Sequence, residues 1–201
     1  MINGISRGLV RVRNRIASHN FPGLMWILEG FNLVDEQRLR DVGPDRCAAE
    51  WIVKCGGKIK FDKMPDIFED YNCLIRGTSV LDPRDPNDNV KLVWIDATNA
   101  SVTGYGCLHF KGLKNIEEVN FVHCNTLHDH GLEYMGLYVG DVLKKLELSD
   151  CPKITEYGLV HLSKFVALKE LKLIKLNNVY HIEKVLNELE KSLPDCKIIH
   201  Q

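Results

Sequence analysis

The chain has 201 residues, of which 45% are hydrophobic and 26% charged, and its formal net charge is −1. This composition is typical of a globular protein with one core of moderate size or two small ones. It gives no support for a nucleic-acid-binding protein, because phosphate contacts require a basic excess, and no apolar run approaches the length of a transmembrane helix. The seven cysteines contain no Cys-x-x-Cys pair, which favours a reduced protein over a disulfide framework or a zinc module.

The N-terminal 28 residues differ from this average. They contain no acidic residue and four arginines, namely Arg7, Arg11, Arg13 and Arg15. An arginine-rich segment without acids is typical of a mitochondrial presequence, so residues 1–28 are predicted to be one. A solvated basic tail is the alternative.

An apolar and aromatic segment, FPGLMWILEGFNLV, occupies residues 21–34. It is too short to span a bilayer. Two interpretations remain open for it. The segment either packs on the folded domain, which is slightly favoured, or lies in a membrane interface.

Residues 29–89 are predicted to form an N-terminal helical capping domain. Asp35 suits the N-cap of a short helix that ends at Gly43. Pro44 suits the first turn of a second helix, which ends near Cys55 because two glycines follow it.

A strand and a loop complete this N-terminal part. Residues 58–61 alternate between apolar and polar side chains, which predicts a strand. Residues 81–89 contain two prolines among acids and amides, which predicts a loop that joins the two parts of the chain.

A repeated pattern begins after this loop. The sequence L-x-x-L-x-L-x-x-C/T, with aliphatic or aromatic residues at the L positions, recurs four times in residues 90–201, and only the fourth copy departs from it, with Leu176 in the C/T position. The repeats start 26, 27 and 25 residues apart, at Val90, Ile116, Leu143 and Leu168. A matching glycine follows in three of them, at Gly106, Gly131 and Gly158. This spacing is typical of leucine-rich repeats.

The predicted fold is therefore α/β, a short leucine-rich-repeat solenoid of about four repeats with an N-terminal helical capping domain. Parallel strands alternate with helices, and stacked neighbours close a core that one repeat cannot close alone. Cys124 and Cys151 are expected to form a small buried ladder where strands turn toward helices. Residues 179–201, with a helix over 182–193 and a strand over 197–200, are expected to cap the C-terminal end.

The strand residues that point away from this core are expected to line a concave sheet face. Their charges are mixed, and a tryptophan lies at one edge. Such a surface suits a protein partner, for which aromatic residues are favoured anchors. The residues proposed for partner binding are Trp94, Asp96, Asn120, Val122, Glu147 and Lys172.

The sequence contains no nucleophile elbow, phosphate loop, dinucleotide fingerprint or His-Glu-x-x-His motif, so the chain is predicted not to be an enzyme. His123, Cys124, His128 and His130 form the densest polar cluster. A zinc site there is disfavoured, because the repeat places Cys124 inward and the histidines at the strand end and in the loop.

Several stretches resemble one family. The most specific run is residues 40–46, RDVGPDR, followed by Ala49-Glu50-Trp51 and Cys55-Gly56. Residues 70–72, residues 95–98 and residues 192–194 continue the match in order. On these residues the chain resembles the mitochondrial ATP synthase subunit s, or coupling factor B, family over most of its folded part.

The resemblance implies a non-catalytic coupling factor of mitochondrial ATP synthase that limits proton leak. It implies a peripheral location on the matrix side of the inner mitochondrial membrane, with ATP synthase subunits as partners. It also implies Mg²⁺ bound by main-chain oxygens, and the matching residues here are Gly56 and Thr98. The alternatives are an assembly factor for the distal membrane arm of respiratory complex I and a cytosolic substrate adaptor.

Overall fold

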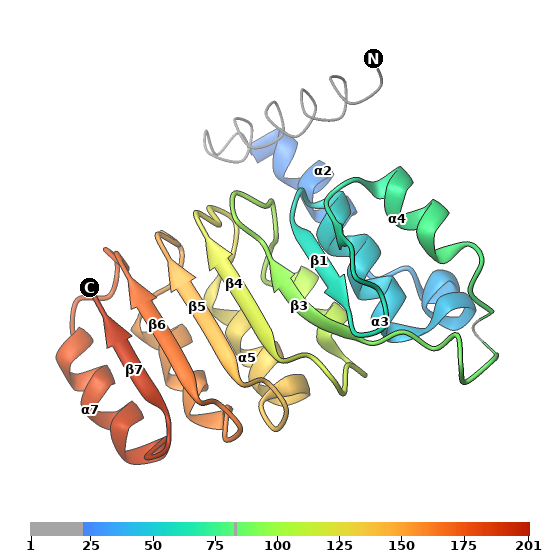
Figure 1. Cartoon of the computed structure of the whole chain (residues 1–201). Coiled ribbons are helices and arrows are strands. Elements are labelled where there is room, and N and C mark those ends of the chain that lie inside the picture. Colours follow the sequence, from blue (N-terminus) through green and yellow to red (C-terminus); the bar gives the residue numbers. More distant parts are fainter. Residues whose placement is uncertain (1–21, 83) are drawn as a thin grey trace.

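An open seven-stranded sheet organises the part of the chain that the structure, a computed structural model, describes, which is residues 22–82 and 84–201 (Figure 1). The four arginines of the predicted presequence lie outside these residues. The strands are β1 (Lys58–Phe61), β2 (Ile67–Phe68), β3 (Leu92–Asp96), β4 (Glu118–Val122), β5 (Lys145–Ser149), β6 (Glu170–Ile174) and β7 (Lys197–His200). The α helices are α2 (Pro22–Asn32), α3 (Glu36–Lys54), α4 (Tyr71–Thr78), α5 (Asp129–Val139), α6 (Glu156–Leu159) and α7 (Ile182–Ser192). Two 3-10 helices are η1 (Tyr105–Phe110) and η2 (Val160–Lys164).

Strands β3 to β7 are parallel neighbours in chain order. Equivalent repeat positions lie side by side across them, as in the row Ile95, Val119, Leu146, Leu171 and Ile198. The first four of these side chains are buried against the helices on one face of the sheet. The prediction of an α/β fold with parallel strands is therefore confirmed.

The N-terminal part also contributes strands. β1 pairs antiparallel with β3, with Ile59 opposite Ile95, and β2 adds a further antiparallel pair at the sheet edge. The prediction of strand 58–61 is confirmed, whereas β2 and helix α4 were not predicted. One sheet therefore continues across the predicted domain boundary at residues 89 and 90.

Helix α3 bends where the sequence changes from glycine to proline. Asp35 caps its start by accepting a hydrogen bond from the Arg38 N–H at 2.9 Å. Gly43 lies inside it with φ 79° and ψ 172°, a conformation that favours glycine, and Pro44 restarts the helix. The chain leaves α3 through Gly56, whose φ is 91°. The predicted pair of helices is confirmed as two segments around this bend.

The turns that follow strands β3 to β6 share one conformation. A non-glycine residue with positive φ stands in each of them, and these residues are Asn99, His123, Asp150 and Lys175. Two of the turns are completed by buried thiols. The Cys124 Sγ–H donates to the Ala97 carbonyl at 3.1 Å, and the Cys151 Sγ–H donates to the Phe121 carbonyl at 3.5 Å. The predicted cysteine ladder is thus confirmed.

The repeat glycines mark the places where successive helices approach closely. A Cβ atom added at Gly131 would lie 3.1 Å from the Gly104 Cα atom at the start of η1, and one added at Gly158 would lie 3.0 Å from the Asp129 Cα atom at the start of α5. The sequence between β4 and β5 forms the regular helix α5, whereas the corresponding segment of the next repeat is divided between α6 and η2.

Candidate functional site

Two turns that the sequence separates by some forty residues meet at the end of β3. The Ser101 N–H donates to the Cys55 carbonyl at 2.9 Å, which ties the second turn to the end of α3. A Cβ atom added at Gly57 would lie 2.9 Å from the Asp96 carbonyl oxygen and 3.3 Å from the Ala97 Cα atom. The turns that contain Gly56 and Thr98 are therefore adjacent.

The donor atoms of these turns suit a hard cation. The Asp96 carboxylate holds the second turn by accepting a hydrogen bond from the Thr98 N–H at 3.0 Å. Main-chain and carboxylate oxygens are ligands that Mg²⁺ accepts, so the residues present fit this ion.

The described side chains offer no alternative metal centre. In residues 22–82 and 84–201, no group of three or more His, Cys, Asp or Glu side chains is placed to hold an ion. The His123 Nδ1 atom lies 2.6 Å from the Asp150 carboxylate, and Cys124 is buried. His128 and His130 stack on each other with ring centroids 5.6 Å apart. The four residues of the disfavoured zinc interpretation do not converge.

A buried asparagine connects α2 to the rest of the fold. Asn32 is fully buried, and its Nδ2 group donates to the Leu28 carbonyl at 2.8 Å and the Ser101 carbonyl at 3.0 Å. Its Oδ1 atom accepts from the Trp51 Nε1–H and from the Thr103 N–H, both at 3.0 Å. One side chain therefore joins α2, α3 and the turn after β3. Sequence analysis missed it, although a lone asparagine in an apolar run was visible.

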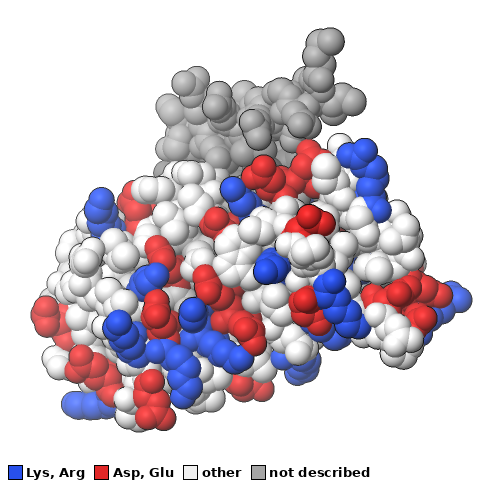
Figure 2. All heavy atoms as spheres, in the orientation of Figure 1, with Lys and Arg blue, Asp and Glu red and all other residues white. Residues whose placement is uncertain are grey.

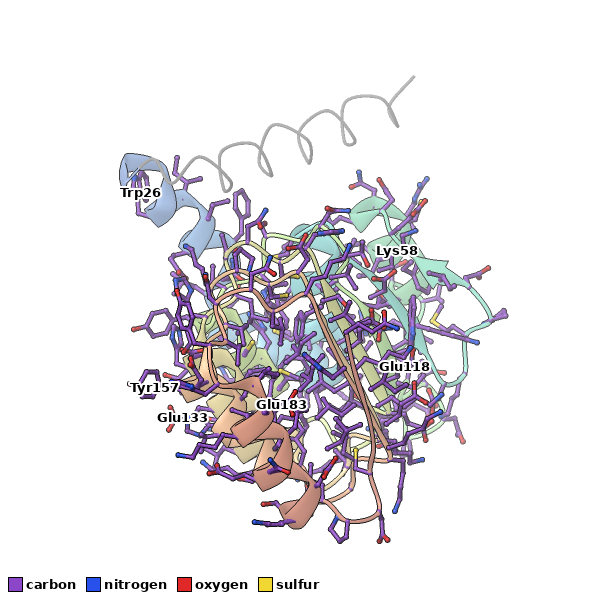
Figure 3. The ribbon with its side chains drawn as sticks, turned by 90° about the vertical axis from the view of Figure 1, so that its left-hand side faces the viewer. Trp26, Lys58, Glu118, Glu133, Tyr157 and Glu183 are labelled. Atoms are coloured by element: carbon purple, nitrogen blue, oxygen red, sulfur yellow. The ribbon has the colours of Figure 1, made fainter. Side chains whose placement is uncertain are left out.

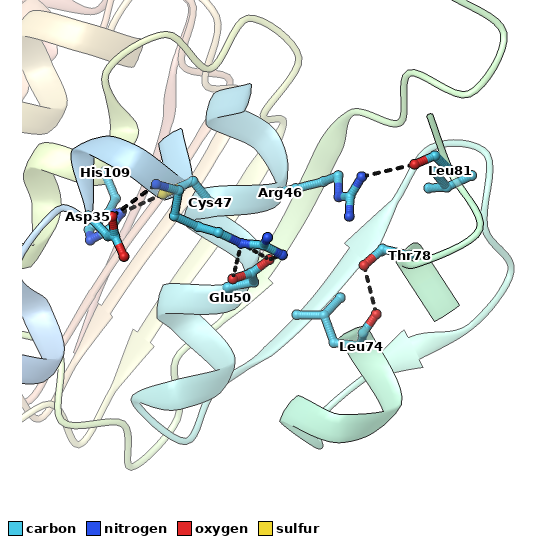
Figure 4. A network of polar contacts seen from close by, with 9 residues as sticks. Asp35, Arg46, Cys47, Glu50, Leu74, Thr78, Leu81 and His109 are labelled. Carbon is cyan, nitrogen blue, oxygen red and sulfur yellow. Dashed lines mark hydrogen bonds and ion pairs between the residues drawn. The ribbon is translucent and has the colours of Figure 1, made fainter. Parts of the chain in front are cut away.

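His109 and Cys47 form a second polar contact of the core (Figure 4), and both are held in uncharged forms. His109 stacks on Trp51 with ring centroids 4.8 Å apart and an interplanar angle of 6°. Burial lowers the pKa of His109 to about 4 and raises the pKa of the neighbouring Cys47 thiol to about 11. Both groups are therefore neutral near pH 7, and a protonated thiol is a weak nucleophile.

Helix α2 presents apolar side chains to solvent beside its buried ones. Trp26 is 72% exposed, Phe31 45% and the adjoining Leu33 68%, whereas Leu28 is 2% exposed. Trp26 points away from the body of the protein (Figure 3). Leu28 and Asn32 therefore pack on the folded domain as the first interpretation predicts, whereas the membrane-interface interpretation of the exposed side chains stays a prediction. Within the described residues, no helix combines the length and the apolar character needed to cross a membrane.

The six residues predicted to bind a partner all lie on the sheet face opposite the helices. Glu118 marks this face, and Glu133 of α5 projects from the other side (Figure 3). Strand register aligns Asp96 with Asn120, Glu147 and Lys172 in one row across four strands. Trp94 lies two residues before Asp96 in β3, and Val122 lies two residues after Asn120, at the end of β4. The sequence pattern therefore gave the correct side for all six.

Charges on this face neutralise one another across the strands. The Trp94 Nε1–H donates to the Glu118 carboxylate at 3.1 Å, and the Lys145 Nζ atom lies 3.7 Å from the same carboxylate. The Lys172 Nζ atom lies 3.4 Å from the Glu147 carboxylate. Figure 2 shows the resulting alternation of acidic and basic groups over the sheet. Each exposed pair contributes little to stability.

Comparison with known proteins gives consistent matches over most of the chain. The chain is 32% identical over 175 residues to a Bos taurus protein called ATP synthase subunit s, mitochondrial. It is 33% identical to the Mus musculus protein of that name and 30% identical to the Homo sapiens one. Each match covers 86% of this chain and 84% of the relative. No protein-family model matches the chain.

Proposed function

Because the chain belongs to the family of mitochondrial ATP synthase subunit s, we propose that it is a non-catalytic coupling factor of mitochondrial ATP synthase. In this role it supports proton-coupled ATP synthesis by limiting proton leak at the inner membrane. The similarity over 175 residues to proteins of that name carries the proposal.

We infer that residues 90–201 form a short leucine-rich-repeat solenoid that acts as a binding scaffold. Support comes from the parallel register of β3 to β7 and from the shared positive-φ turns. The close approach at Gly131 and Gly158 supports it further, because stacked repeats need small residues where their helices touch. Residues 29–89 are the cap that extends the same sheet at one end.

The sheet face is the proposed surface for an ATP synthase subunit. Its central rows pair Glu147 with Lys172 and Glu118 with Lys145, which gives an alternating charge pattern that a partner has to match. Trp94, at the start of this pattern, is a half-buried aromatic residue of the kind that anchors protein interfaces. Asp96, Asn120 and Val122 complete the surface.

The proposed location is the matrix side of the inner mitochondrial membrane, reached with residues 1–28 as presequence. The proposed attachment is peripheral and uses the exposed side chains of Phe31 and Leu33, which follow the presequence. Phenylalanine and leucine are suited to the membrane interface, where apolar side chains leave water without entering the hydrocarbon centre. Asn32 holds the same segment to the folded domain.

Membrane attachment is tested by exchanging the exposed side chains and keeping the buried ones. The double variant Phe31→Ser, Leu33→Ser is expected to bind cardiolipin-containing vesicles at least about tenfold more weakly, because two apolar side chains no longer leave water. Vesicle co-sedimentation with unchanged circular dichroism measures the effect. A matched control exchanges two exposed apolar residues on the helical side, namely Tyr157→Ser and Val166→Ser. Equal binding by wild type and the α2 variant would contradict this attachment.

We further propose that Mg²⁺ binds between the turns of Gly56 and Thr98 through their carbonyl oxygens. The ion would supply positive charge that holds the cap against the first repeat. A ligand of the folded state stabilises it by mass action, so Mg²⁺ at 100 times its Kd is expected to raise Tm by about 5 °C or more. Scanning calorimetry after chelation, with Mg²⁺ then restored at constant ionic strength, measures this change. A Tm that is the same with chelator and with Mg²⁺ would exclude the site.

The functional proposal itself is tested in mitochondria that lack the protein. Loss of a leak-limiting factor is expected to raise oxygen consumption in the presence of oligomycin and to lower ATP made per oxygen. Restoring the wild-type chain should reverse both changes. Normal leak and normal ATP yield in its absence would refute the proposal.

A further inference from the structure

Asp96 lies where the sheet face meets the turn of Thr98. It is the last residue of β3, and its side chain lies on the sheet face in register with Asn120 of β4. On the other side of β3, the first residue of β1, Lys58, stands opposite Asp96. Beyond Asp96, the cap therefore places the turn of Gly56 and Gly57 beside the chain instead of a strand.

The peptide groups after β3 show where its last carbonyl oxygens point. The N–H groups of Ala97 and Asn99 donate to carbonyl oxygens of β4, each at 2.8 Å. Both peptide bonds are trans, and in a trans peptide the C=O points opposite to the N–H. The carbonyl oxygens of Asp96 and Thr98 therefore point away from β4 and toward the cap. The close approach of Gly57, whose added Cβ atom would lie 2.9 Å from the Asp96 carbonyl oxygen, agrees with this direction.

The same reasoning applies to the turn that ends α3. The Gly57 N–H donates to the Ile52 carbonyl oxygen at 2.9 Å, so the Gly56 carbonyl oxygen points away from α3. The positive φ of Gly56, 91°, makes this reversal possible. Each turn thus directs one carbonyl oxygen, that of Gly56 or of Thr98, out of the hydrogen-bonded element that it follows.

The Asp96 carboxylate is the acidic group of these two turns. Its Oδ1 atom accepts from the Thr98 N–H at 3.0 Å and from the Thr98 hydroxyl at 2.5 Å. Main-chain bond lengths then place the carboxylate within about 7 Å of the Thr98 carbonyl oxygen. The lysine opposite, Lys58, has its Nζ atom 3.2 Å from the Glu69 carboxylate instead. Salt does not fully screen a charge at this range, because the Debye length at physiological ionic strength is about 8 Å.

The third repeat has a similar pair of side chains in a different setting. Glu147 stands in the same row as Asp96, and its carboxylate accepts from the Ser149 hydroxyl at 2.8 Å. Its strand, β5, has a parallel strand on each side, and the Lys172 Nζ atom lies 3.4 Å from its carboxylate. An acid that holds a hydroxyl is therefore a feature of the sheet face, and at β3 this feature lies beside a second turn.

We propose that the Asp96 carboxylate sets the cation affinity of the two turns, because it supplies their negative charge and holds Thr98 in place. The role requires the Mg²⁺ site proposed above, and it gives a residue of the sheet face a second function. Carbonyl ligands are neutral, so they leave the charge of a divalent cation without a counter-charge. Mg²⁺ retains several of its waters in proteins, so a carboxylate near the site acts on it without direct contact.

Calorimetric titration of the full chain with MgCl₂ at constant ionic strength tests this role. Asp96→Asn keeps an oxygen that accepts from Thr98 but removes the charge, so Mg²⁺ is expected to bind about tenfold more weakly. Asp96→Ala also releases Thr98 and should weaken binding further. Glu147→Gln is the matched control, since it removes a hydroxyl-bonded acid of the same row, and it should bind Mg²⁺ like wild type. Circular dichroism and Tm in EDTA show whether each variant is folded.

The variants separate a role in ion binding from a purely structural one. Equal Mg²⁺ affinity in wild type and Asp96→Asn would overturn the proposal, because the charge would then contribute nothing. An equal loss in Glu147→Gln would also overturn it, because any acid of the sheet face would then have the same effect. Absence of Mg²⁺ binding by the wild-type chain would remove the site and this role together. These titrations use the chain and the metal alone, so their outcome is distinct from a failure to bind ATP synthase.

Discussion

Gly106→Ala is expected to destabilise the protein by about 3 kcal/mol or more, which corresponds to a Tm lower by about 6 to 12 °C. A Cβ atom at this position would lie 2.2 Å from the Asn32 Oδ1 atom and 2.7 Å from the Trp51 Cζ2 atom. Both side chains are buried and hydrogen-bonded to each other, so neither can move away from the added atom without breaking that hydrogen bond. Thermal and urea unfolding of the purified chain measure the change.

Gly30→Ala is the matched control for this substitution. Gly30 lies within helix α2, and an added Cβ atom there meets nothing within 4 Å. Alanine should therefore leave Tm unchanged or raise it, since it lowers the entropy cost of forming the helix. If both variants unfolded at the wild-type temperature, the close packing of η1 on Asn32 and Trp51 would be disproved.

Asn32→Leu is expected to cost about 3 to 5 kcal/mol, because the exchange keeps the branched shape and the number of side-chain heavy atoms but removes every hydrogen bond of the side chain. The Trp51 Nε1–H and the Thr103 N–H would then be buried without an acceptor. Equilibrium unfolding by urea gives the free energy directly. Asn177→Leu, at an exposed position, is the control and should be nearly neutral.

A double-mutant cycle locates the source of the Asn32 effect. Trp51→Phe removes the indole N–H that Asn32 accepts, so the two substitutions together should cost less than their sum by about 1 kcal/mol or more. Strict additivity would mean that the Asn32–Trp51 hydrogen bond contributes nothing to stability.

The repeat strands were predictable from the sequence, because residues such as Val119 and Leu146 recur with period two at a fixed spacing. The bend of α3 was predictable for a local reason, since Gly43-Pro44 cannot continue a helix. The side of the sheet that carries Trp94 followed from the same alternation. These features depend on local pattern, which the sequence displays directly.

Features that depend on distant contacts were not predictable in the same way. β2 consists of Ile67 and Phe68 only, and it is a strand because these residues pair with β1. A two-residue strand is too short to show a periodic pattern in the sequence. The position of Asp96 beside Gly57 depends on the pairing of β3 with β1, which the local pattern of neither strand shows. The function of Asn32 likewise depends on Trp51 and Thr103, which lie 19 and 71 residues away.

Affinity purification of the tagged chain from mild-detergent extracts of mitochondria tests directly whether the chain binds ATP synthase. Intact ATP synthase is expected to co-purify with the chain and to co-migrate with it on a native gel. A variant with Trp94→Ala and Lys172→Glu on the sheet face should lose that complex while remaining folded. Co-migration with assembly intermediates of the distal arm of complex I, without ATP synthase subunits, would contradict the proposed role as a coupling factor of ATP synthase.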